Sequence, residues 1–98
     1  MTWPNQKIET NGLQINVYRT GNGEKPPIVM LHGITDNALC WTRTTRDMEA
    51  NYDVVMIDAR GHGDSDKPET GYSPGDHAAD VAGVINHLEL KRPVLLGH

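Results

Sequence analysis

Three short segments of the sequence combine glycine with residues that can take part in catalysis, and each one ends or directly follows an apolar run. The segments are Leu31–Ile34 (LHGI), Asp58–Ser65 (DARGHGDS) and Leu96–His98 (LGH). A glycine at the end of a strand lets the chain turn sharply, so that the next backbone N–H can point into a crevice. Acyl transfer needs such fixed donors, because its tetrahedral intermediate develops an oxyanion. The alternative is that His32-Gly33 is only a turn that ends a strand.

The sequence contains five histidines, which differ in their expected roles. His32 and His98 flank the predicted crevice, and His62 lies in the neighbouring loop. His77 and His87 fall on a predicted helix, where we expect them to be surface residues.

Other groups of reactive residues do not form a recognisable site. Asp76, His77 and Asp80 are spaced poorly for a metal, because Asp76 and His77 are adjacent and do not share a helix face. Gly21–Lys25 lacks the spacing of a phosphate loop. Cys40 is the only cysteine, which excludes a disulfide within the chain, and we expect it to lie in the core together with the neighbouring tryptophan. We therefore expect neither a metal nor a cofactor.

The first part of the chain is predicted to form a β-hairpin. Residues 7–10 and 13–19 flank Asn11-Gly12, a pair that favours a type I′ turn. In the second strand Leu13, Ile15 and Val17 alternate with polar residues, among them Asn16, which are expected on the wetter face.

Three later runs, residues 28–31, 54–57 and 94–96, are apolar throughout. Continuous apolar strands are typical of a parallel sheet that is covered by helices on both faces. The run at 94–96 is therefore expected to be a buried strand, although no helix follows it to cover its open edge.

Two helices are predicted between these runs. The first covers residues 38–48, with Asp36 or Asn37 as its N-cap. The second begins with Ser73-Pro74-Gly75-Asp76, which resembles a capping box, and ends before Pro93. Its buried face is expected to carry Ala78, Val81, Ala82, Ile85 and Leu88, while Ala79, Ala82 and Gly83 would let it lie close to the sheet.

The order hairpin, strand, helix, strand, helix, strand predicts an α/β fold in which catalytic residues gather at the carboxyl ends of the strands. The three strand-end segments together resemble the α/β-hydrolase family over essentially the whole chain. Residues 1–98 would then be the N-terminal part of a single α/β-hydrolase domain, truncated at the nucleophile elbow. A modified serine, a chain break or a real truncation would each account for an end at this point.

The resemblance implies a role for each segment. The amide of Ile34 would donate to the oxyanion hole, with His32, Gly33 and Thr35 shaping this loop. Asp58, Arg60, Gly61 and Gly63 match the family's Asp-x-Arg-Gly-x-Gly-x-Ser loop. Gly97 and His98 match the start of a Gly-His-Ser-x-Gly elbow, whose serine would come next.

The second segment is interpreted as structural rather than catalytic. Gly61 and Gly63 supply backbone freedom for the turn, and Asp58 and Arg60 can brace the loop through a charge-assisted hydrogen bond. Asp58 is not the triad acid, because in this family the acid follows the nucleophile in sequence.

The function implied by the resemblance is a serine hydrolase, in first place a carboxylesterase that acts on small esters through an acyl-enzyme. Epoxide hydrolases of the family usually carry proline where this chain has Thr35, which favours a serine nucleophile. The alternatives are a non-catalytic ligand-binding protein of the same fold and an inactive fragment. The triad itself would lie beyond residue 98.

Composition narrows the possible partners. The net charge of −4 and the scattered Lys and Arg residues argue against nucleic-acid binding. The first residues lack the basic and apolar regions of a signal peptide, and no apolar run approaches the ~20 residues that span a bilayer. We expect a cytoplasmic protein whose partners are a small ester-like substrate and the remainder of the same domain.

Overall fold

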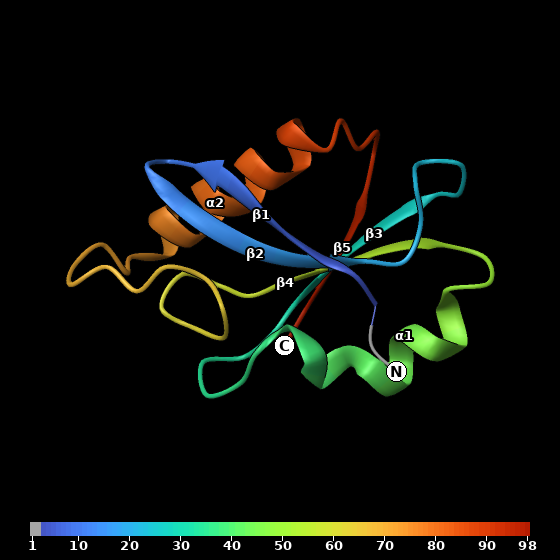
Figure 1. Ribbon diagram of the computed structural model, residues 1–98, viewed down its shortest axis with the longest axis horizontal. Helices are drawn as coiled ribbons and strands as arrows, with labels where there is room; N and C mark the ends of the chain where they lie inside the picture. The colour runs from blue at the N-terminus through green and yellow to red at the C-terminus, as the bar shows by residue number, and fades with distance from the viewer. Residues whose placement is uncertain (1–2) are drawn as a thin grey trace.

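The computed structural model describes residues 3–98 as a mixed five-stranded sheet with helices on both faces (Figure 1). The strand order is β1-β2-β4-β3-β5, and β3 is parallel to both β4 and β5. The predicted α/β fold, with an antiparallel hairpin that leads into parallel strands, is therefore confirmed. The elements are β1 (Asn5–Thr10), β2 (Leu13–Arg19), β3 (Pro27–Leu31), η1 (Ala38–Trp41), α1 (Thr42–Met48), β4 (Asp53–Ile57), α2 (Pro74–His87) and β5 (Val94–Gly97).

The opening hairpin has the predicted turn. Asn11 and Gly12 both have positive φ, 54° and 77°, as a type I′ turn requires, and Thr10 pairs with Leu13 across it. Strand β1 begins two residues earlier than predicted. Strand β2 then pairs antiparallel with β4, which attaches the hairpin to the parallel part of the sheet.

Strands β3 and β4 contribute side chains to two separate cores. Val29, Val55 and Ile57 pack in the core that faces α2, whereas Met30 and Met56 pack in the core that faces η1 and α1. All five residues of β4 are buried. The structure confirms that these strands are apolar throughout because helices cover both of their faces.

Strand β5 differs from the prediction. It forms and pairs with β3, but Val94, Leu95 and Leu96 are exposed to 60%, 53% and 40%. Their exposure has a simple cause: β5 is the edge strand of the described sheet, and no described helix lies over its outer side.

The first predicted helix is split in two. Its first turn, η1, is a 3₁₀ helix, and the side chain of Asn37 caps it by accepting a hydrogen bond from the Leu39 N–H. Trp41 packs against the core, as expected, but Cys40 is exposed, so its expected place in the core is wrong. The tighter 3₁₀ turn changes which residues face the sheet, and Ala38 is the buried one.

The second helix begins as predicted, and its buried face agrees with the prediction in part. Ser73 and Asp76 form the expected capping box, with Pro74 in the first turn. Val81, Ile85 and Leu88 of the predicted face pack against the core, as expected. Ala78 and Ala82 are exposed instead, and the residues buried most completely are Asp80 and Val84. The pattern of apolar residues does not indicate Asp80, because Asp80 is charged and is buried together with its ion-pair partner Arg60.

Gly83 of α2 lies close to the hairpin. A β-carbon added at Gly83 would overlap the side chain of Thr10 on β1, so the predicted close approach at Gly83 is confirmed. Ala79 and Ala82 are exposed and take no part in it.

We predict that Gly83→Ala lowers the free energy of unfolding by about 1–3 kcal/mol, because overpacking at Thr10 outweighs the gain in helix propensity of about 1 kcal/mol. Gly75→Ala is the matched control on the same helix, since its β-carbon would meet only the Ser73 Oγ at 3.7 Å. Urea unfolding of both variants tests this. An unchanged or raised stability for Gly83→Ala would contradict the packing argument.

Candidate active site

The three strand-end segments of the sequence lie around one cavity of about 430 Å³. Its lining includes Leu31–Ile34 after β3, Asp58–Arg60 and His62 after β4, and His98 after β5. Helix α2 closes another side through residues that include His77 and Val81. The structure thus brings together residues that are far apart in sequence, at the carboxyl ends of parallel strands where α/β folds place their ligands.

Asp58 is buried beneath this cavity and binds three separate segments. Its Oδ1 accepts from the Ala38 N–H at 2.7 Å, and its Oδ2 accepts from the Asn16 side chain at 2.9 Å and from the Asp64 N–H at 3.0 Å. The Asp58 backbone oxygen accepts from the Ser65 hydroxyl at 2.6 Å. Both carboxylate oxygens are occupied by donors of the protein, so Asp58 acts as a brace.

Gly63 is required by the same network. Its φ is +50°, and an added β-carbon would overlap the Asp58 carboxylate. The loop can curl around the carboxylate only because this position has no side chain. The neighbouring Gly61, with φ +80°, leaves room for the ring of Tyr72.

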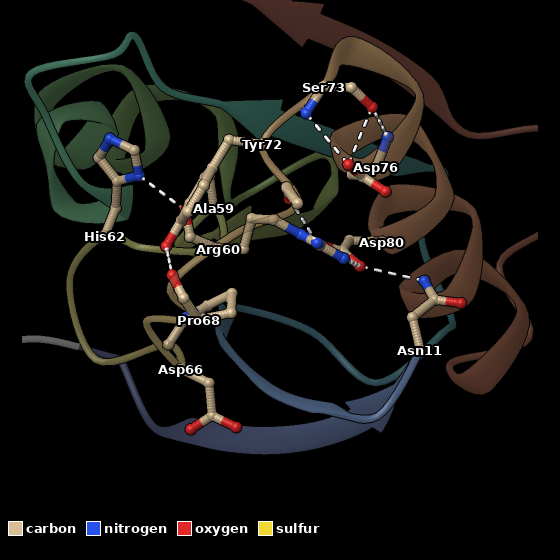
Figure 2. Close-up of polar contacts among 12 residues, drawn as sticks. Asn11, Ala59, Arg60, His62, Asp66, Pro68, Tyr72, Ser73, Asp76 and Asp80 are labelled. Carbon is tan, nitrogen blue, oxygen red and sulfur yellow. Dashed lines mark hydrogen bonds and ion pairs between the residues drawn. The ribbon is translucent and has the colours of Figure 1, made fainter.

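Arg60 braces the loop from the other side, through Asp80 rather than Asp58 (Figure 2). Its Nε and Nη2 donate to the Asp80 carboxylate at 2.6 and 2.8 Å, and its Nη1 donates to the Gly71 oxygen at 2.6 Å. Asn11 of the hairpin turn also donates to Asp80, at 3.0 Å. The expected hydrogen bond between Asp58 and Arg60 is therefore wrong, because each side chain is bonded to other residues.

The ion pair shifts the titration of both partners. Burial raises the pKa of Asp80, but hydrogen bonds donated by Arg60 and Asn11 outweigh burial and bring the pKa below its ordinary value. The hydrogen bond to Asp80 raises the pKa of Arg60 further above its already high value. Both groups are therefore charged throughout the neutral range.

His32 connects two of the strand ends. Its Nε2 accepts from the Ala59 N–H at 3.0 Å, which leaves Nδ1 as the protonated nitrogen that donates to the Gly33 oxygen at 2.6 Å. The Gly33 oxygen and the Ile34 N–H belong to the same peptide group. A hydrogen bond to the oxygen polarises that group and makes its N–H a stronger donor.

Of the remaining predicted site residues, Ile34 and His98 line the cavity, whereas Thr35 and Gly97 do not. Ile34 is 86% exposed, and Thr35 and Gly97 are exposed beside the other loops. The His98 N–H donates to the Leu31 oxygen at 3.0 Å. A β-carbon at Gly33 would come within 3.1 Å of His98 Nδ1, so the first and third segments are in near contact.

Sequence reasoning missed two residues of the network. Asn16 was expected on the wetter face of β2 but is fully buried, with its side chain on Asp58. Asp80 was considered only as a poor metal ligand, whereas it is the partner of Arg60. No local signal in the sequence identifies these partners, because Asn16 is 42 residues from Asp58 and Asp80 is 20 residues from Arg60.

Comparison with known proteins identifies the family. A model of the alpha/beta hydrolase fold matches residues 26–98, and the chain therefore belongs to this family. Among curated proteins, 2-(acetamidomethylene)succinate hydrolase of Mesorhizobium japonicum is 36% identical over 93 residues, which are 95% of this chain and 33% of the relative. Epoxide hydrolase 4 of Mus musculus is 31% identical over 94 residues, 94% of this chain and 26% of the relative.

Solved structures agree with this assignment. The structure of E-2-(acetamidomethylene)succinate hydrolase matches with a TM-score of 0.89 and 33% identity, covering 98% of this chain and 35% of that one. Epoxide hydrolase A of Mycobacterium thermoresistibile matches with a TM-score of 0.90 and 28% identity, covering 97% and 31%. The chain spans between about a quarter and a third of the length of these relatives, which are named as hydrolases of a succinate derivative or of epoxides rather than as carboxylesterases.

No helix within residues 3–98 is long and apolar enough to cross a membrane. Over the same range, no group of three or more His, Cys, Asp and Glu residues is placed to hold a metal ion.

We predict a pH-dependent cost for Asp80→Asn. Because the folded pKa of Asp80 is lowered, its contribution to stability is complete above the unfolded value of 3.8 and is lost as the pH falls through the folded pKa. At pH 7 the variant leaves Arg60 buried without its partner and loses about 3–5 kcal/mol of unfolding free energy.

Urea unfolding between pH 7 and pH 3 measures the gap in unfolding free energy between the parent protein and Asp80→Asn. The gap should narrow below pH 4, whereas a constant gap would show that Asp80 does not titrate as argued. Asp47→Asn on the exposed surface of α1 is the control, and it should leave the unfolding free energy nearly unchanged at every pH.

Proposed function

We propose that the full-length protein containing this chain is a serine hydrolase that cleaves small carboxylic esters through an acyl-enzyme. One observation supports this most directly: the three strand-end segments surround a single cavity, and the peptide group that contains the Ile34 N–H is held there by His32. The family membership supports hydrolysis in general. The ester substrate and the serine nucleophile are the more specific claims of the proposal, and they go beyond what the family membership supports.

In the proposed mechanism a serine that follows His98 attacks the ester carbonyl while the catalytic histidine takes the proton of its hydroxyl group. The carbonyl oxygen becomes an oxyanion and accepts hydrogen bonds from the Ile34 N–H and from the amide after the nucleophile. The alkoxide leaves with a proton from the catalytic histidine, and water then hydrolyses the acyl-enzyme by the same steps in reverse order. One such donor contributes about 2.7–4 kcal/mol of transition-state stabilisation.

A second candidate is epoxide hydrolysis, because several of the relatives are named epoxide hydrolases. In that reaction an aspartate would replace the serine as nucleophile. Thr35 argues against it, since the epoxide hydrolases of the family usually carry proline at this position. One relative is named 2-(acetamidomethylene)succinate hydrolase, so the substrate of the proposed acyl transfer could also be an amide-like compound instead of an ester. A non-catalytic binding protein is the remaining alternative.

Full-length protein incubated with a fluorophosphonate probe distinguishes these candidates. A serine hydrolase should lose its activity toward p-nitrophenyl acetate as one equivalent of probe is attached, and peptide mapping should locate the adduct on the residue after His98. Opening of styrene oxide without labelling would replace the proposal by epoxide hydrolysis. Absence of labelling and of turnover on both substrates would favour the binding protein.

A further inference from the structure

The ring of His62 is placed between two backbone carbonyl groups from different loops. Its Nε2 lies 2.6 Å from the oxygen of Ile34, and its Nδ1 lies 2.9 Å from the oxygen of Arg60. Figure 2 shows the ring turned toward the Ala59–Arg60 backbone. Carbonyl oxygens only accept hydrogen bonds, so each contact is a hydrogen bond only when the ring nitrogen in it carries a proton. A neutral ring can donate at one nitrogen, and the shorter contact is the one to Ile34.

Ile34 depends on such hydrogen bonds for its orientation. Its side chain is 86% exposed, so side-chain packing does little to fix the residue. On its N-terminal side, the Gly33 oxygen accepts from His32 Nδ1 and from the Asp36 N–H at 3.2 Å. On its C-terminal side, its own oxygen accepts from His62. The two peptide planes that flank Ile34 are thus each held, and together they fix the direction of its N–H.

The other end of this link is firmly anchored. The His62 N–H donates to the Ala59 oxygen at 2.9 Å, and its own oxygen accepts from the Ser65 N–H at 3.1 Å. Ser65 is buried and bonded to Asp58. The imidazole also lies against His32, with the ring centroids 5.0 Å apart. His62 therefore joins an exposed loop to the most strongly hydrogen-bonded loop of the site.

We propose that His62 is a positioning residue that aims the Ile34 N–H at the oxyanion. This inference rests on the proposed function, because it needs the Ile34 amide to act as a donor in acyl transfer. His62 would not touch the substrate and would act only through the Ile34 peptide. A donor displaced by a fraction of an ångström loses much of its effect, since oxyanion stabilisation depends on the distance and angle to the developing charge.

Two substitutions in the full-length protein separate the two contacts of the ring. His62→Gln places an amide N–H₂ near the position of Nε2 and can keep the bond to Ile34. His62→Asn places its amide near Nδ1 and can keep only the bond to Arg60. With p-nitrophenyl acetate, His62→Asn should lower kcat by about tenfold to a hundredfold with KM little changed. His62→Gln should recover most of that loss, and His87→Gln, on the exposed surface of α2, is the matched control.

Amide hydrogen exchange gives a readout that does not need activity. In His62→Asn, exchange should accelerate in the peptide that contains residues 33–35 and stay unchanged in β4 and α2, while His62→Gln should behave like the parent protein. Unchanged exchange at 33–35, or equal losses of kcat in the Gln and Asn variants, would overturn the proposal for His62. If the variants show the predicted exchange pattern but the parent protein hydrolyses no ester, the proposed function is overturned. The link between His62 and Ile34 would then remain supported.

Discussion

The arrangement of the site depends on one buried carboxylate, that of Asp58. It lies directly after β4 and accepts hydrogen bonds from the side chain of Asn16 on β2, from the first amide of η1 and from the Asp64 amide in its own loop. Taking a carboxylate out of water is costly unless donors replace its hydration. Here two neutral backbone amides and one side-chain amide do so, and no positive side chain is needed. The carboxylate therefore fixes the distances between the hairpin, the loop after β3 and the loop after β4.

Arg60 and Asp80 add a second constraint of a different kind. Their bidentate ion pair joins the loop after β4 to the middle of α2, and Asn11 ties both to the hairpin turn. A buried pair of this type contributes little net stability compared with apolar packing, but it is costly to break and permits one geometry only. Since Arg60 is two residues from Asp58 and from His62, the pair and the carboxylate hold the same short loop from opposite sides. This explains how a loop rich in glycine can be well ordered.

Local patterns in the sequence were sufficient for most of the fold. The Asn11-Gly12 turn, the apolar runs and the capping box at Ser73 each depend on residues that are close in sequence. The turn, the capping box and the three strands were confirmed, although β5 is exposed rather than buried. The three strand-end segments were also predicted correctly to meet, because parallel topology brings carboxyl ends to one edge. What could not be predicted were partners distant in sequence: Asp80 lies 20 residues from Arg60, and Asn16 lies 42 residues from Asp58. The prediction for Cys40 was wrong for another reason. A 3₁₀ turn shifts the buried face of the segment, and the apolar pattern of so short a turn is not enough to reveal this shift.

The contribution of the described residues to catalysis can be bounded by energy. Enzymes lower the barriers of their reactions by about 8–23 kcal/mol, and a single oxyanion donor supplies about 2.7–4 kcal/mol of this. Even with Ile34 held on both sides by His32 and His62, residues 3–98 would therefore provide a minor part of the proposed rate enhancement. Their larger effect is geometric, because a donor contributes its full share only when it is fixed before the charge develops. Side-chain packing does not fix the backbone of an exposed isoleucine. At Ile34 the hydrogen bonds to the carbonyl groups of Gly33 and of Ile34 itself fix it instead.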